Sequence, residues 1–241
     1  EAVLPGVRVD SPVQAWVYLE KFDEGVRAFH ELEAPSASDY RWLGVCLYKL
    51  VRDEESLEAL YRARDLGEEG ARVNLAHLLP FLERADEGKH ELSSVRLDRL
   101  SEYDKVLYYR VLSMEEENSG NLREALRAAE EAWRRIQGMP EYPLLAPSVL
   151  SQLAVLYARI GRSQRALWFL ERGLSGTRGI ERLKARLRRA TVLVALGRHQ
   201  EARLDLESLE LDNESLELDE GPEAERDYLL GEISLTQGDY R

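Results

Sequence analysis

A short motif that recurs along the second half of the chain places the strongest constraint on its fold. Each copy begins with a glycine, continues with mostly polar residues and reaches an alanine five residues later. Glycine readily takes the left-handed conformation that ends a helix, and a small alanine lets two helices approach closely. The motif therefore predicts repeated helix pairs joined by tight turns. Its copies are Gly120–Ala125, Gly161–Ala166 and Gly197–Ala202, and a fourth copy opens at Gly238.

The segments beside these glycines carry apolar residues at the spacing of an amphipathic helix. In one of them Leu150, Leu153, Ala154 and Tyr157 recur at intervals of three and four residues, the period of a helix that buries one face. Strand-like alternation is absent from the sequence, so we predict an all-α fold. The expected helices lie near residues 11–19, 23–33, 39–51, 54–66, 70–82, 85–97, 101–118, 121–137, 146–160, 163–174, 178–196, 199–210 and 222–237.

Prolines refine these boundaries, because a proline inside a helix removes a hydrogen bond and clashes with the preceding turn. Pro80 falls late in a predicted helix and should end or kink it. The remaining prolines of the repeat region are expected between helices: Pro35, Pro140, Pro143, Pro147 and Pro222.

The pattern resembles the tetratricopeptide repeat in a divergent, bacterial-type form. The best copy combines the apolar residues from Leu150 to Tyr157 with the turn glycine and the alanine that follow. Earlier copies depart from the family pattern, because Gly25 and Gly88 stand at the alanine position and the turn glycine is missing. The positions that the resemblance marks as structural are Gly44, Gly120, Ala125, Ala154, Tyr157, Gly161, Ala166, Gly197, Ala202, Gly231 and Gly238.

The resemblance implies a single right-handed superhelical solenoid of antiparallel helix pairs. Because the sequence begins at Glu1 and stops at Arg241 inside a repeat, we expect a fragment of a longer chain. An uncovered apolar C-terminal end would allow self-association. The expected repeats span residues 9–37, 39–68, 70–100, 103–138, 146–176 and 180–211, with a partial repeat at 222–241.

Composition and motifs argue against several classes of function. The net charge of −12 disfavours DNA and acidic membrane surfaces. Cys46 is the only cysteine, no apolar run approaches the length of a membrane span, and no signal peptide is visible. The four histidines are too far apart for a metal-ligand motif, and phosphate-binding and nucleophile motifs are absent. We therefore expect a cytoplasmic protein with no catalytic activity, cofactor or metal.

In the tetratricopeptide family the first helix of each pair lines a concave groove that takes an extended peptide or a partner helix. The resemblance places several candidate contacts on first helices of this chain. They are Arg41, Tyr48, Lys49, His77, Arg110 and Arg159.

Charge is strongly segregated near the C-terminus. Residues 159–203 contain twelve basic and three acidic residues, whereas residues 204–241 contain thirteen acidic and two basic residues. Two interpretations stay open: the two blocks pack together and offset each other, or the basic block binds an acidic partner. The second interpretation adds Arg182, Arg186 and Arg189 to the candidate contacts.

These features predict a scaffold or interaction module that binds a peptide or helix of another protein, in the groove or along the basic helix. The alternative is a ligand- or peptide-sensing arm of a larger bacterial transcription regulator or signalling protein.

Overall fold

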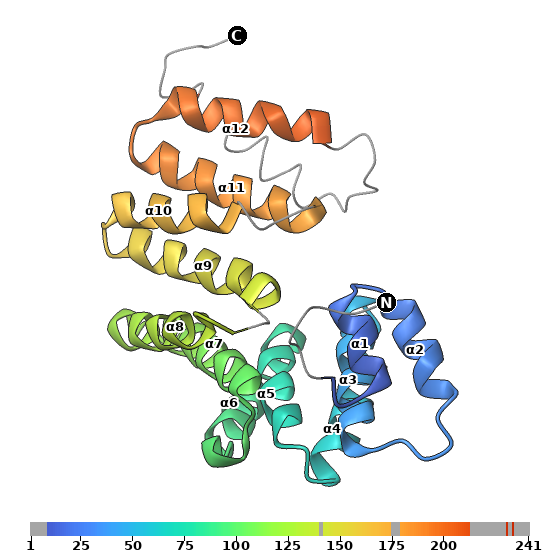
Figure 1. Ribbon diagram of the computed structural model, residues 1–241. Helices are drawn as coiled ribbons and strands as arrows, with labels where there is room; N and C mark the ends of the chain where they lie inside the picture. Colours follow the sequence, from blue (N-terminus) through green and yellow to red (C-terminus); the bar gives the residue numbers. More distant parts are fainter. Residues whose placement is uncertain (1–8, 140–141, 175–178, 213–229, 231–232, 234–241) are drawn as a thin grey trace. The chain divides into compact units, whose positions relative to one another are not determined.

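The structure, a computed structural model, describes residues 9–139, 142–174 and 179–212 together with residues 230 and 233. Every regular element in these residues is a helix (Figure 1), which confirms the all-α prediction. The chain divides into two compact units. The first comprises residues 1–121 and 134–144, and the second comprises residues 122–133 and 145–241.

The first unit is built from helix pairs whose first helices are neighbours. α1 packs on α3, α3 on α5 and α5 on α7, and the pairs α1–α2, α3–α4 and α5–α6 each pack internally. The first unit contains α1 (Pro12–Tyr18), α2 (Phe22–His30), α3 (Ala37–Lys49), α4 (Asp53–Asp65), α5 (Glu69–Leu78), a 3-10 turn η1 (Leu79–Leu82), α6 (Ala85–Ser93), a second 3-10 turn η2 (Leu97–Arg99) and α7 (Glu102–Asn118).

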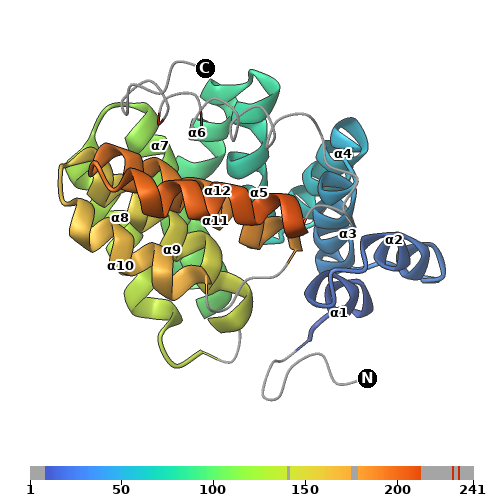
Figure 2. The same cartoon turned by 90° about the horizontal axis from the view of Figure 1, so that it is seen from above.

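The second unit contains three complete helices and parts of two others, residues 122–133 and residues 145–159. α10 packs on α11, and α11 packs on α12; Figure 1 shows α11 and α12 side by side, and in the view of Figure 2 α12 lies over α11. Their bounds are α8 (Leu122–Ile136), α9 (Tyr142–Arg159), α10 (Ser163–Leu174), α11 (Gly179–Ala195) and α12 (His199–Asp212). Twelve α-helices thus lie where the sequence predicts them, and the predicted helix at 222–237 falls largely outside the described residues.

Serine caps explain where two of the first helices begin. The Ser36 hydroxyl accepts the amide of Asp39 at 3.2 Å, and the Asp39 carboxylate accepts the amide of Ser36 at 2.8 Å. This reciprocal pair satisfies donors that the first turn of α3 leaves unpaired. The Ser101 hydroxyl likewise accepts the amide of Asp104 at the start of α7, which fixes the Asp104 carboxylate in the first turn of that helix.

The turn inside each helix pair has one residue in the left-handed region, whether or not that residue is glycine. Gly161 (φ +74°) and Val51 (φ +57°) occupy the same place in their turns. The residue after Val51, Arg52, donates its amide to the Leu47 carbonyl at 2.9 Å, five residues back. The equivalent bonds occur after Glu20, Glu83, Gly120, Gly161 and Gly197. The early repeats therefore keep the turn of the later ones without the glycine.

Replacing Val51 with glycine should stabilise the first unit. A left-handed residue with a side chain costs about 1–2 kcal/mol, and Val51 is 81% exposed, so its side chain contributes little packing. Glycine also adds entropy to the unfolded chain, which offsets part of this gain. We therefore expect the free energy of unfolding, measured with urea, to rise by about 1 kcal/mol. Leu66→Gly is the control, since Leu66 is exposed but has an ordinary φ of −81°; it should bring no gain. An equal change in the free energy of unfolding for Val51→Gly and Leu66→Gly would contradict this explanation.

Small residues allow helices to approach closely, both within a pair and between successive pairs. A Cβ atom on Gly44 would lie 2.6 Å from Leu60 Cγ, and one on Gly25 would lie 2.5 Å from Cys46 Sγ. The Ser56 hydroxyl also donates to the Gly44 carbonyl at 2.7 Å. The described alanines of the repeat motif are fully buried; they are Ala125, Ala154, Ala166 and Ala202. Gly231 and Gly238 lie outside the described residues.

The structure tests the predictions for Pro80, Pro143 and Pro147, whereas Pro140 and Pro222 lie outside the described residues. Pro80 stands in η1 directly after α5, which confirms that it ends the helix. The prediction that Pro143 and Pro147 lie between helices is wrong, because both fall inside α9. Pro143 is in the first turn, where its missing amide has no intrahelical partner to lose. Pro147 lacks the bond to residue 143, but Ala146 and Leu150 beside it are buried, and this packing compensates.

Candidate functional site

The first helices α3, α5 and α7 bring polar side chains together in two rows, of which the first is buried. Arg41 is 4% exposed. Its Nε donates to Asn74 Oδ1 at 2.9 Å, its Nη1 lies 3.3 Å from a Glu68 carboxylate oxygen, and its Nη2 bonds the Asp104 carboxylate. A Cβ atom on Gly70 would overlap the guanidinium. Burial lowers the pKa of Arg41, but the neighbouring carboxylates outweigh it and raise the pKa.

This row joins three consecutive first helices through one charged side chain. The sequence marks Arg41 as a groove contact for a partner, and the structure places it in a buried network with Asn74 and Asp104. The sequence did not predict Asn74 and Asp104 as partners of Arg41. They lie 33 and 63 residues away along the chain, and no local pattern indicates a contact at such separations.

The second row lies further along the same helices and is more open. The His77 ring contacts the Tyr48 ring at 5.8 Å and the Phe81 ring at 5.5 Å, both edge to face. Arg110 and Lys49 are close enough for their charges to act on His77. We name Tyr48, Lys49, His77, Phe81 and Arg110 the aromatic–cationic surface.

The electrostatics of this surface come from its two cations. Burial lowers the pKa of His77 to about 3, and the charges of Arg110 and Lys49 act in the same direction. His77 is therefore neutral at physiological pH, with one ring nitrogen as a donor and the other as an acceptor. Burial raises the pKa of Tyr48, and Arg110 opposes the shift. The surface thus combines positive charge, a neutral imidazole and aromatic rings, which suits a carboxylate beside an apolar group.

Phe81 belongs to this surface but was not among the predicted contacts. Its side chain is 60% exposed although it is large and apolar. The available signal was Pro80, because a proline that ends α5 turns the following residue out of the helix. Tyr48, Lys49, His77 and Arg110, by contrast, were predicted and are brought together in the first unit.

The basic residues of the second unit divide between internal pairs and exposed positions. Arg189 on α11 lies 2.8 Å from Asp205 on α12 and 4.0 Å from Glu171. The pair with Asp205 is one contact between the basic block and the acidic block. Arg159 and Arg182 are exposed, and Arg186 is partly buried.

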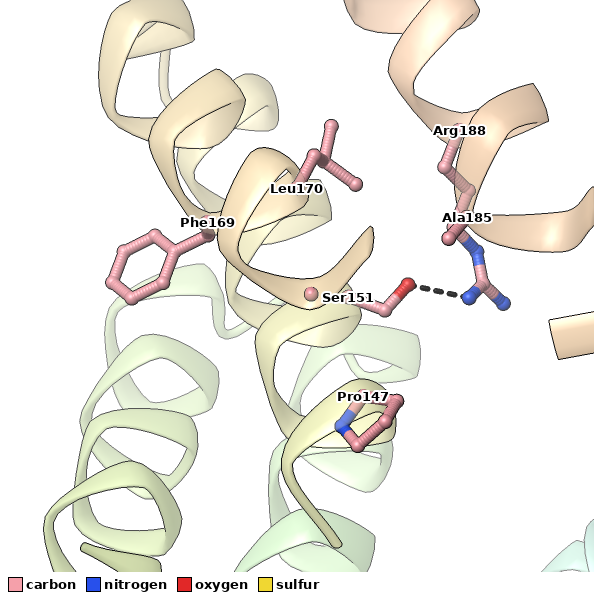
Figure 3. A pocket seen from close by; sticks show the side chains of 7 residues that line it. Pro147, Ser151, Phe169, Leu170, Ala185 and Arg188 are labelled. Carbon is pink, nitrogen blue, oxygen red and sulfur yellow. Dashed lines mark hydrogen bonds between the residues drawn. The ribbon is translucent and has the colours of Figure 1, made fainter. Parts of the chain in front are cut away.

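A small depression in the second unit lies between α9, α10 and α11 (Figure 3). Pro147 and Ser151 come from α9, Leu170 from α10, and Ala185 and Arg188 from α11. The Arg188 guanidinium donates to the Ser151 hydroxyl across it. Its volume of about 270 Å³ includes open solvent, so it is smaller than ligand sites usually are. In the described part of the chain, no three histidine, cysteine or carboxylate side chains gather as a metal site would require.

No family model and no curated protein matches this sequence. Solved structures match its fold. A chain of the Cut9–Hcn1 hetero-tetramer of the APC/C aligns with a TM-score of 0.75 and 13% identity, over 92% of this chain and 41% of that one. This chain therefore spans less than half of that relative.

Two further structures cover more of their own length. NprR in complex with its cognate peptide NprX aligns with a TM-score of 0.59 and 16% identity, over 95% of this chain and 68% of that one. A tetratricopeptide repeat protein from Parabacteroides merdae aligns with a TM-score of 0.59 and 14% identity, over 92% and 81%. None of the described helices has the length and apolarity needed to cross a membrane. The chain thus has the fold of tetratricopeptide-repeat proteins, built from helix pairs with left-handed turns and adjacent first helices.

Proposed function

We propose that this chain is a non-catalytic module that binds a peptide or helix of a partner protein on the aromatic–cationic surface of its first unit. The observation that carries the proposal is the exposed Phe81 ring against His77, which also contacts Tyr48 and lies within reach of the charges of Lys49 and Arg110. Aromatic residues and arginine dominate the binding energy of protein interfaces.

The chemistry of the surface favours a partner segment with a carboxylate next to an apolar side chain. Lys49 and Arg110 supply charge for the carboxylate, and a neutral His77 does not compete with them for counter-ions. An apolar side chain of the partner would cover Phe81, which is 60% exposed. NprR, which has a similar fold, is solved with its cognate peptide, and this precedent supports a peptide as the ligand. The exposed arginines of the second unit, Arg159 and Arg182, remain proposed additional contacts for acidic partners.

The second candidate is a sensing arm of a larger regulator. NprR is described as a quorum sensor, which is the reason to keep this candidate. A natural chain that continues into a DNA-binding or kinase segment would favour it, whereas further repeats would favour a scaffold.

Selection of a random peptide library on the purified chain tests the proposed surface. Selected peptides should carry a carboxylate next to an apolar residue, and Lys49→Glu/Phe81→Ala should weaken their binding at least about tenfold, because it removes both charge and apolar contact. Fluorescence anisotropy of a labelled peptide gives the affinity.

The matched control is Arg62→Glu/Leu66→Ala at the C-terminal end of α4. Both of these side chains are exposed and lie outside the aromatic–cationic surface, so the charge change and the apolar loss are similar. The control should bind like the parent chain. The proposed site would be wrong if both double variants lost the same peptide affinity, or if the selected peptides bound both with the affinity of the parent chain.

A further inference from the structure

Val51 differs from the residues at the same place in the other turns of the helix pairs. It takes the left-handed conformation with φ +57°, which a β-branched residue rarely adopts. Elsewhere the described turns have glutamate or glycine at this position: Glu20, Glu83, Gly120, Gly161 and Gly197. Among the described turns, only Val51 therefore combines the left-handed conformation with an apolar side chain.

Packing within the described part of the chain does not account for this valine. Its side chain is 81% exposed, more than any other large apolar side chain among the described residues. The left-handed conformation costs free energy that glycine would not cost, and no buried contact offsets it. Backbone strain of this kind is common at positions that bind a ligand, so the observation favours a contact of Val51 with a partner.

Val51 adjoins the aromatic–cationic surface. Its amide donates to the carbonyl of Tyr48 at 3.1 Å, in the last turn of α3. Phe81, which is 60% exposed, follows the end of α5 in the same way. α3 and α5 pack on each other, and the rings of Tyr48 and His77 join them. The axes of packed helices lie about 8–10 Å apart, so a partner segment of a few residues reaches both Val51 and Phe81.

The charges next to Val51 suit an apolar group of the partner better than a second carboxylate. Arg52 is paired with Glu55 at 2.6 Å. Asp53 begins α4, and its charge acts on Tyr48. This end of the surface therefore offers no additional positive charge, unlike the part around the two cations, and a carboxylate of the partner is favoured near those cations instead.

We propose that Val51 is a specificity-determining contact of the aromatic–cationic surface, so that the partner segment carries two apolar side chains beside its carboxylate. One of them covers Phe81 and the other covers Val51. Valine supplies two methyl groups for this contact and restricts the backbone of the turn, whereas glycine would do neither. This contact rests on the proposed function, because it belongs to the same peptide site.

Selection from a peptide library with one fixed glutamate and random flanking positions tests the role of Val51. Peptides selected on the parent chain should be apolar at two positions. Selection on Val51→Thr should lose the apolar preference at one of these positions, and selection on Phe81→Ala should lose it at the other, because each variant removes one apolar contact. An unchanged preference on Val51→Thr, or loss at the same position in both selections, would overturn the proposal.

In Val51→Gly, peptide affinity and stability should change in opposite directions. Fluorescence anisotropy of a selected peptide should show binding weakened at least about fourfold, the effect of one buried methylene group, whereas urea unfolding should show the stabilisation expected above. Val51→Thr keeps the branched side chain, so it should weaken binding without that gain. Glu20→Gly is the matched control, since Glu20 is exposed, has φ +57° and offers no apolar contact; it should bind like the parent chain.

The variant Lys49→Glu/Phe81→Ala separates the role of Val51 from the proposed function. If this variant loses affinity while both Val51 variants bind like the parent chain, the peptide site stands and the contact with Val51 is wrong. Weaker binding of Val51→Gly without weaker binding of Val51→Thr would assign the effect to the backbone and also overturn the contact. If Lys49→Glu/Phe81→Ala binds like the parent chain, the proposed function fails and the contact fails with it.

Discussion

Replacing Arg41 with methionine should lower the free energy of unfolding of the first unit by about 3–5 kcal/mol. The substitution keeps most of the side-chain length but leaves the buried Asp104 carboxylate without its cation. An uncompensated buried charge is expensive because the protein interior solvates it poorly. Urea unfolding followed by far-ultraviolet circular dichroism measures the loss. A cost as small as that of a surface ion pair would show that the network contributes no more than an exposed pair.

The double variant Arg41→Met/Asp104→Leu separates the cost of an unpaired charge from the worth of the pair. Replacing both partners with apolar residues removes the stranded carboxylate, so the double variant should be more stable than Arg41→Met alone. Arg52→Met is the control, since it breaks the exposed pair with Glu55, and it should change stability much less. A double variant as unstable as the sum of the two single variants would contradict this account.

Gly44→Ala should destabilise the first unit by about 1–3 kcal/mol, although alanine is normally the better helix former by about 1 kcal/mol. The reason is steric: the new methyl group would lie 2.6 Å from Leu60 Cγ and 2.8 Å from its Cδ2. α3 and α4 would have to separate, and Leu60, which is 2% exposed, would lose packing. Thermal unfolding monitored by circular dichroism measures the change.

Leu60→Ala provides the test of the steric explanation. Alone it should cost about 2–5 kcal/mol, because it leaves a cavity. Combined with Gly44→Ala it should cost less than the sum of the two changes, since the alanine methyl then occupies part of that cavity. Strict additivity would show that the cost of Gly44→Ala arises elsewhere than in the contact with Leu60.

Much of the fold was predictable because its signals are local. Helices and their ends follow from apolar period, serine caps and left-handed turns, which involve residues at most a few positions apart. The prediction was wrong for Pro143 and Pro147, since the local penalty of a proline is outweighed in α9 by burial of Ala146 and Leu150. The turn at Val51 shows the same effect, because the packing of α3 on α4 holds a residue in a conformation that it disfavours.

The candidate site was predictable only in part. The repeat pattern placed Tyr48, His77 and Arg110 on first helices, and equivalent positions of successive repeats converge when those helices pack. Phe81 was missed, because an apolar residue after a helix normally turns inward, and its exposure follows from the geometry of η1.

By itself, then, the sequence determined the helix pairs and their turns, and it proposed candidate positions for binding. Only the tertiary structure decided which of these side chains pair with other residues of the same chain. In the sequence nothing distinguishes Arg41 and Arg189 from Lys49 and Arg182. In the structure Arg41 is buried and pairs with Asp104, and Arg189 pairs with Asp205. The physical reason is that the role of a charge depends on its solvation and on partners distant in sequence, and these are set only when the helices pack.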